Sequence, residues 1–119
     1  FYMDCLFCKI IAGEIPSTKI YEDESVYAFA DIDPQAPFHA IVVPKKHITS
    51  AAEITDENSS YVAKIFEAVA KIAKQENLEQ GFRVVTNCGK DGGQTVGICI
   101  SICLLADIYS GLQAKKLHN

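Results

Sequence analysis

Alternating apolar and polar positions divide this chain into short strands around one longer amphipathic helix. Short stretches of strand-forming residues predict strands over residues 19–22, 26–32, 39–43, 82–87 and 96–105. Residues 26–32 and the last stretch alternate, whereas residues 39–43 are mostly apolar. Apolar side chains spaced three and four residues apart predict a helix that begins at Thr55 and runs to about Asn77. A shorter apolar stretch, residues 4–11, predicts a small N-terminal helix. This order of elements predicts an α+β domain, with a mainly antiparallel five-stranded sheet covered on one face.

Polar residues are expected at the starts of both helices. Asp4 is placed to cap the short helix, and Thr55 is placed to cap the long one. Asp56 and Glu57 follow Thr55 and suit the positive end of the helix dipole.

The last predicted strand has two unlike faces, because successive side chains of a strand point to opposite sides of the sheet. One face carries Ile98, Ile100 and Ile102, and the other carries Cys99, Ser101 and Cys103. Taken alone, this composition is typical of a buried strand and contains nothing catalytic.

The composition is that of one small globular domain. The chain has 119 residues, 49% of them hydrophobic, and a net charge of −4. That charge, with a sequence pI near 5.3, argues against a general nucleic-acid binder or a protein that binds anionic membranes. No apolar run reaches the length of a membrane span, and we see no signal peptide. Phe1 and Tyr2 precede Met3, which we interpret as the natural start.

The chain contains five cysteines, an odd number. Without a secretory signal, this number favours a reducing cytoplasm over a disulfide framework. A domain of this size buries a limited fraction of its surface, and many such domains gain stability as dimers. We therefore expect a cytoplasmic homodimer.

Cys5, Cys8 and His47 form a partial zinc-binding pattern. A Cys-x-x-Cys pair with a distant imidazole suits the tetrahedral coordination of zinc. The alternative is a pair of buried thiols on a short helix. A thioredoxin-like role is unfavoured, because the pair lies outside a βαβ unit.

Five motifs follow one another along the chain. They are Cys5-Leu6-Phe7-Cys8-Lys9-Ile10-Ile11, Gly13-Glu14-Ile15-Pro16, Asp31-Ile32-x-Pro34-Gln35-Ala36-Pro37-x-His39, Pro44-Lys45-Lys46-His47 and Asp91-Gly92-Gly93-Gln94-Thr95-Val96. Together they resemble the histidine-triad (HIT) family over residues 4–96, and its Hint branch in particular.

The resemblance implies a HIT-like fold, a homodimer and no organic cofactor. It also implies hydrolysis of phosphoramidate or phosphoanhydride bonds in purine nucleoside monophosphates, AMP-type substrates first. In the family the middle histidine of the triad attacks the α-phosphorus and forms a nucleotidyl-histidine. A neighbouring imidazole then protonates the departing amine.

The resemblance also assigns roles to individual residues. Phe7, Ile10 and Phe29 correspond to the base pocket, and Asp31 with Ile32 corresponds to the ribose site. The phosphate loop corresponds to Asn87, Gly93, Gln94 and Thr95. His39 corresponds to a residue of the relay that orients the triad. Each role has an ordinary alternative. The three apolar residues suit a core, the glycine loop suits a turn, and His39 suits a hydrogen-bonded core position.

The triad itself falls on isoleucines. Counting on from Val96 places its three histidines at Ile98, Ile100 and Ile102, so the chain as printed lacks a nucleophile. In metal-binding relatives the first triad histidine, here Ile98, completes the zinc site. A slip of one residue along the strand would offer Cys99 in its place.

A change of reading frame explains the isoleucines. Isoleucine codons begin with AT, so the frame one base earlier reads NAT, which can encode histidine. From the last base of codon 97, a suitable back-translation reads His-Leu-His-Phe-His-Leu-Leu-Ala-Gly-Arg-His-Leu-Gln-Trp-Pro-Pro-Gly and then stop. This resembles the triad and the C-terminus of the family. We hypothesise that residues 98–119 are out of frame relative to the family.

Three functions therefore remain open. The first is a HIT-type nucleotide hydrolase. The second is a catalytically silent nucleotide-binding protein that keeps Asp31, Asn87 and the glycine loop. The third is a small zinc-stabilised interaction module that uses Cys5, Cys8 and His47.

Overall fold

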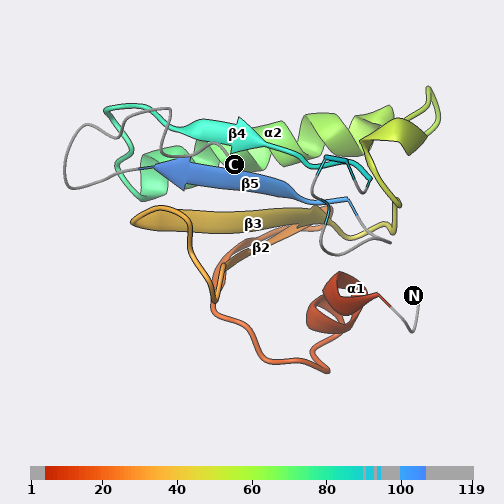
Figure 1. Ribbon diagram of the computed structural model, residues 1–119, viewed down its shortest axis with the longest axis horizontal. Coiled ribbons are helices and arrows are strands. Elements are labelled where there is room, and N and C mark those ends of the chain that lie inside the picture. Colours follow the sequence, from red (N-terminus) through yellow and green to blue (C-terminus); the bar gives the residue numbers. More distant parts are fainter. Residues whose placement is uncertain (1–4, 90, 93, 95–99, 107–119) are drawn as a thin grey trace.

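The computed structural model describes residues 5–89, 91, 92, 94 and 100–106 (Figure 1). Its elements are the helix α1 (Leu6–Ile11), the strands β1 (Lys19–Glu22), β2 (Val26–Ala30) and β3 (Phe38–Pro44), the 3-10 helix η1 (Ala51–Glu53), the helix α2 (Ser59–Gln75), and the strands β4 (Arg83–Val85) and β5 (Ile102–Ala106). The α+β class and the five-stranded antiparallel sheet expected from the sequence are confirmed.

The sheet has the order β1-β2-β3-β5-β4, and each neighbouring pair is antiparallel. The last described strand therefore lies inside the sheet, between β3 and β4. In the ladder between β3 and β5, Val42 lies opposite Ile102 and His39 lies opposite Leu105. This register decides which residues of β5 face each side of the sheet.

One face of the sheet packs against α2. This core contains Val26 and Ala28 of β2, Ala40 and Val42 of β3, Ile102, Leu104 and Ala106 of β5, and Ile65, Ala68, Val69 and Ile72 of α2. In every strand these residues are two apart, as the period of a strand requires. The helical residues recur at spacings of three and four. The sequence predicted an apolar stripe of Val62, Ile65, Phe66, Val69, Ile72 and Ala73. Its members Ile65, Val69 and Ile72 are buried, whereas Phe66 is 48% exposed, so its place in the core is corrected.

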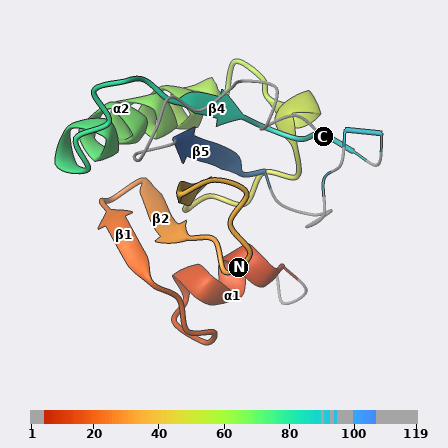
Figure 2. The same cartoon turned by 60° about the vertical axis from the view of Figure 1, so that its left-hand side comes forward.

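The opposite face carries a second core, which forms under α1 (Figure 2). It consists of Cys5, Phe7, Cys8, Ile10, Tyr27, Phe29 and Val43. The expectation of a sheet covered on one face is therefore corrected, because α1 covers part of the other. The alternation of β2 and β3 provides apolar residues for both sides.

Both helices begin later than their predicted caps. Cys5 caps α1, and its Sγ accepts a hydrogen bond from the Cys8 amide at 3.3 Å. The long helix begins at Ser59, after Asn58. Thr55 instead opens a preceding turn, where its Oγ1 accepts from the Glu57 amide at 3.2 Å. Neither helix of the described part is long and apolar enough to cross a bilayer.

Ile102 occupies a different face from the one that the triad alignment requires. Residues 100 and 101 precede β5, which begins at Ile102 rather than 96, and Ile102 packs in the core under α2. A shift of one residue exchanges the two faces of a strand. Burial of Ile102 and Leu104 under α2 favours this register, because both are apolar and nearly inaccessible to solvent. Ile98 lies outside the described residues.

Substitutions in β5 test this register. We expect Ile102→Ala and Leu104→Ala each to lower the free energy of unfolding by about 2–5 kcal/mol, because each leaves a cavity under α2. Urea unfolding gives the value. Cys103→Ala, on the other face, is the matched control and is expected to cost about 1 kcal/mol. If Ile102→Ala lowers the free energy of unfolding by no more than Cys103→Ala does, β5 pairs in the other register.

Candidate functional site

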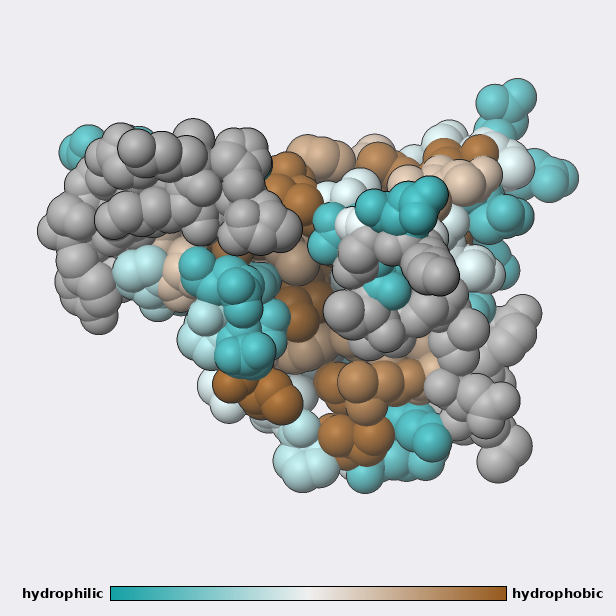
Figure 3. All heavy atoms as spheres, in the orientation of Figure 1, coloured by the Kyte–Doolittle hydropathy of each residue, from teal (hydrophilic) through white to brown (hydrophobic). Residues whose placement is uncertain are grey.

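A cavity of about 260 Å³ opens between α1, the segment after α1 and the end of β2. Its lining residues are Leu6, Phe7, Ile10, Ile15, Pro16, Ser17, Phe29, Ala30, Asp31, Ile32 and Ile41. The volume is a little below the range of about 300–1,000 Å³ that small-molecule sites occupy. In Figure 3, apolar residues gather beside a hollow in the lower part of the molecule. The five residues expected to hold a base and a ribose thus line one cavity.

Aromatic rings support the inner wall of the cavity. The ring centroids of Phe7 and Phe29 are 5.9 Å apart at an interplanar angle of 58°. Tyr27 continues the cluster, 5.9 Å from Phe29 at 34°. Phe7 and Phe29 are nearly buried, so they belong both to the core under α1 and to the cavity wall. Packed rings of this kind suit a flat, apolar ligand group.

Two apolar side chains remain exposed at the cavity. Ile32 is 100% exposed and Leu6 is 41% exposed. Both line the opening, and Ile32 directly follows Asp31. A ligand that covers them would remove apolar surface from water, which favours binding.

Asp31 lies where β2 ends and the cavity begins. Its backbone amide donates to the carbonyl of His39 at 3.0 Å, which fixes its position against β3. Its Oδ1 accepts from the Asp33 amide at 2.9 Å, and its Oδ2 lies 3.3 Å from Nε2 of His39. The carboxylate is partly exposed and carries further lone pairs, so it can accept hydrogen bonds from hydroxyl groups of a ligand.

His39 is buried beside Asp31. Its Nδ1 accepts from the Gln35 amide at 3.0 Å, which leaves the proton of the neutral ring on Nε2. Burial lowers the pKa of this imidazole, although the charges of Asp31 and Asp33 oppose the effect. Nε2 is within ion-pair distance of Asp31 but has no hydrogen bond in the described structure. A buried N–H without a hydrogen bond is unusual, and here the Asp31 carboxylate lies close to it instead.

The strand beside His39 places no imidazole in this site. Leu105 pairs with His39, and Cys103 pairs with Ile41, which lines the cavity. Burial, with a smaller contribution from the charge of Asp31, raises the pKa of the Cys103 thiol to about 11. Such a thiol is protonated at neutral pH and is a poor nucleophile. Ile100 is buried before the strand, and its amide donates to the carbonyl of Ile48 at 2.6 Å.

The glycine loop after β4 is organised by Gln94. Its Oε1 accepts from the Gly89 amide at 2.7 Å, and its Nε2 donates to the carbonyl of Thr49 at 2.9 Å. A side chain at Gly92 would collide with the backbone of Cys88. Asn87 is exposed at the start of the loop. The side chain expected to bind phosphate therefore holds the loop together, while Gly93 and Thr95 lie outside the described residues.

Cys5, Cys8 and His47 converge between α1 and the segment that follows β3. Their ligand atoms all lie within 4.8 Å of one another, and Sγ of Cys8 is 3.1 Å from Nδ1 of His47. Burial lowers the pKa of His47, which keeps the imidazole in the neutral form that binds metal. Two sulfur ligands and one nitrogen ligand are a donor set that zinc prefers. The three residues therefore fit part of a zinc site.

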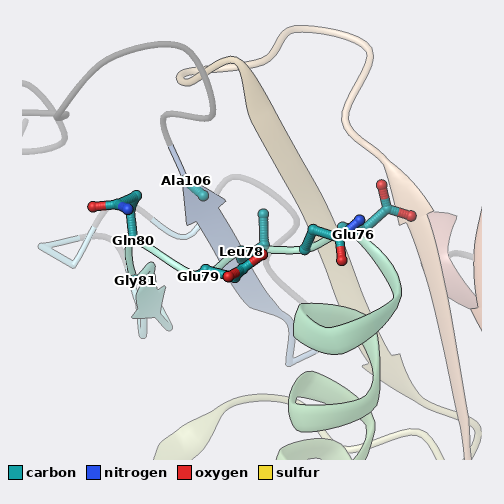
Figure 4. Close-up of a pocket in the computed structure, with 7 residues that line it drawn as sticks. Glu76, Leu78, Glu79, Gln80, Gly81 and Ala106 are labelled. Atoms are coloured by element: carbon teal, nitrogen blue, oxygen red, sulfur yellow. The ribbon is translucent and has the colours of Figure 1, made fainter.

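A second cavity, of about 400 Å³, lies away from this site (Figure 4). It follows the turn from α2 to β4 and includes Glu76, Glu79 and Ala106. Its carboxylates and the negative end of the α2 dipole oppose an anionic ligand. Although it is the larger cavity, its charge is unsuited to a nucleotide.

Several lining residues were given no role in the site from the sequence. Ile41 is two residues beyond His39 in β3, so the period of the strand already placed it on the same face. Ile15, Pro16 and Ser17 come from the segment after α1, and only the folded chain brings them to β2. The sequence placed Cys103 on the strand face opposite to the site. The register of β5 instead pairs Cys103 with Ile41, which lines the cavity.

The chain folds as an antiparallel α+β domain with an apolar cavity, an Asp–His pair and a glycine loop. The HIT domain family matches residues 12–97, so the chain belongs to this family. Protein HitA from Neisseria gonorrhoeae is 43% identical over 93 residues, which are 78% of this chain and 87% of the relative. The 14 kDa zinc-binding protein of Zea mays is 45% identical, and the alignment covers 76% of this chain and 73% of the relative.

Solved structures agree with this membership. The HIT family hydrolase from Clostridium thermocellum has a TM-score of 0.88 and 41% identity, and the alignment covers 96% of this chain and 99% of that one. The histidine triad nucleotide-binding protein from Candida albicans has a TM-score of 0.77 and 35% identity, with 92% and 80% covered.

Metal analysis tests the Cys5, Cys8 and His47 cluster. We expect purified protein to retain zinc and to unfold at a lower temperature after treatment with a chelator, because the metal would tie α1 to the end of β3. Cys8→Ser should lose the zinc. Cys88→Ser, which changes an exposed cysteine outside the cluster, should retain it. Protein that contains no zinc and is unaffected by the chelator would contradict the assignment.

Proposed function

We propose that the cavity binds a purine nucleoside monophosphate of the AMP type. The base would lie against Phe7, Ile10 and Phe29, and Asp31 would accept hydrogen bonds from the ribose hydroxyls. The single observation that carries this proposal is the arrangement of the cavity. It joins an apolar aromatic wall to a carboxylate that is held in place by His39 and Asp33.

The phosphate would then lie towards the glycine loop. Asn87 is exposed at its start, and Gln94 holds the loop in shape rather than being its main phosphate donor. Gly93 and Thr95 keep the phosphate-binding roles that the family resemblance gives them. Backbone amides of a glycine-containing loop can approach an anion closely, because no Cβ intervenes.

We further propose that the in-frame protein is a hydrolase of phosphoramidate and phosphoanhydride bonds. The middle histidine of its triad would attack the α-phosphorus, form a phosphorus–nitrogen bond and displace the amine or phosphate. A neighbouring imidazole would give its proton to the leaving group. Water would then cleave the nucleotidyl-histidine and restore the free imidazole. The C. thermocellum neighbour, which is titled a HIT family hydrolase, supports the reaction type.

The chain with the printed residues 98–119 would bind nucleotide without turning it over. Ile102 is packed under α2, and the face beside His39 carries Cys103 and Leu105, so the described residues of β5 offer no imidazole to the cavity. The family match ends at residue 97, which supports a change of reading frame at that point.

A homodimer is proposed through the β4 edge of the sheet. β4 is the last strand in the order, so one of its sides is unpaired by the described strands. Phe82 directly precedes it and is 40% exposed, and Phe66 of α2 is 48% exposed. Open strand edges and exposed apolar residues are features that a second copy could cover.

A structural zinc ion at Cys5, Cys8 and His47 is proposed as well. The maize relative named a zinc-binding protein supports it, as does the convergence of the three ligand atoms. Thiol ligands must remain reduced, in keeping with the cytoplasmic location that the cysteine content favours.

Titration calorimetry with AMP tests the binding site. We expect AMP to bind the protein, and Asp31→Asn to weaken binding by about 10- to 100-fold, because it removes hydrogen bonds to a charged acceptor. Asp33→Asn is the matched control, since Asp33 is an exposed neighbour that does not line the cavity. Equal affinities of the two variants, or no binding of AMP to the parent protein, would contradict the proposal.

Replacement of the C-terminus tests the missing chemistry. Adenosine 5′-phosphoramidate should stay intact with the printed chain and be hydrolysed when residues 98–119 are replaced by the shifted-frame segment, because only that segment supplies imidazoles. Release of AMP and ammonia is measured by chromatography. Sequencing across codon 97 and an intact mass identify the natural terminus. Turnover by the printed chain, or none by the replaced chain, would refute the assignment.

A further inference from the structure

One polar side chain other than Asp31 lines the cavity among the described residues, and it is Ser17. Ser17 belongs to the segment between α1 and β1 and is exposed. Its Oγ lies 2.7 Å from the hydroxyl oxygen of Tyr27, a residue of β2 that is nearly buried. A hydroxyl group is therefore held at the wall of an otherwise apolar cavity.

The direction of this hydrogen bond determines what Ser17 offers to a ligand. A phenol is a stronger acid than an aliphatic alcohol, so the hydroxyl of Tyr27 is the better donor of the two. Serine oxygen can accept this bond and still donate its own proton. The ring of Tyr27 is held against Phe29, with centroids 5.9 Å apart. Tyr27 thus fixes the acceptor side of Ser17 and leaves its O–H for another partner.

Asp31 does not take this role, because a carboxylate accepts hydrogen bonds, whereas an unprotonated ring nitrogen needs a donor. Asp31 also lies at the end of β2. With a ribose at Asp31 and a base against Phe7 and Phe29, Ser17 is the other polar side chain in the cavity lining that the structure describes. The apolar walls contact all purines of equal shape similarly, whereas a hydrogen bond discriminates between them.

We infer that Ser17 determines base specificity by donating a hydrogen bond to an unprotonated ring nitrogen of a purine, with Tyr27 as its positioning residue. This inference rests on the proposed nucleotide site and adds to it the chemical feature that the site selects. The ligand must present a ring-nitrogen acceptor where Ser17 meets the base. An otherwise identical base with C–H at that position lacks the acceptor and leaves the serine hydroxyl unpaired.

Deaza analogues of AMP test the inference, because each replaces one ring nitrogen by C–H and keeps the shape. Affinities of AMP and of 1-deaza-, 3-deaza- and 7-deaza-AMP are measured by calorimetry. We expect one analogue to bind the parent protein about three- to tenfold more weakly than AMP, the range of one net hydrogen bond. In Ser17→Ala, the affinity for AMP should fall to the affinity for that analogue, so that the ratio of the two affinities becomes one.

Further variants separate a specific role from a general structural one. Ser17→Thr keeps the hydroxyl and should keep the ratio of the affinity for AMP to that for the weakly bound analogue. Tyr27→Phe should reduce this ratio. Thr18→Ala is the matched control, because Thr18 is the exposed neighbour outside the cavity lining. Thermal unfolding of each variant shows that it is folded. Ser17 is exposed, so Ser17→Ala provides the decisive comparison even if Tyr27→Phe fails to fold.

Two results would overturn the inference. One is a parent protein that binds all three analogues as tightly as AMP, and the other is a ratio that persists in Ser17→Ala. If AMP still binds and depends on Asp31, only the role of Ser17 is rejected. If AMP does not bind the parent protein, the proposed nucleotide site and this inference are rejected together.

Discussion

The antiparallel ladder between β3 and β5 determines which side chains meet at the centre of this domain. β3 presents Ala40 and Val42 to α2 and presents His39 and Ile41 to the cavity side. Because β5 pairs with it residue by residue, the register assigns each residue of β5 to one side. A change of one position would exchange the apolar residues under α2 for those beside His39.

The proposed site therefore has two parts, the cavity that would bind a nucleotide and the strand that would carry the reactive side chains. The cavity, Asp31 and His39 are built by α1, β2, β3 and the loop between these strands, all before residue 97. The reactive side chains of a HIT enzyme belong to the strand that corresponds to β5. In this chain the cavity is formed, while β5 offers a protonated thiol at Cys103 and an aliphatic side chain at Leu105. The same fold can thus keep a ligand cavity without the chemistry.

α1 links the cavity to the proposed metal site. Phe7 and Ile10 face the cavity, while Cys5 and Cys8 of the same short segment lie beside His47. A helix of six residues is too short to be stable alone and depends on its tertiary contacts. A metal bound to the two thiols would hold the helix, and with it one wall of the cavity.

The sequence by itself determined the α+β class, the helix stripe of Ile65, Val69 and Ile72, and the separate strands, because local periodicity encodes them. The family resemblance also predicted that Phe7, Phe29 and Asp31 belong to one site, and in the structure these three residues line one cavity. Only the tertiary structure decided that Ile102 faces α2, since a period of two is satisfied by either face until the strand is paired. Tertiary structure also brought Ser17 to Tyr27 and Cys8 to His47, because contacts between distant segments leave no local pattern.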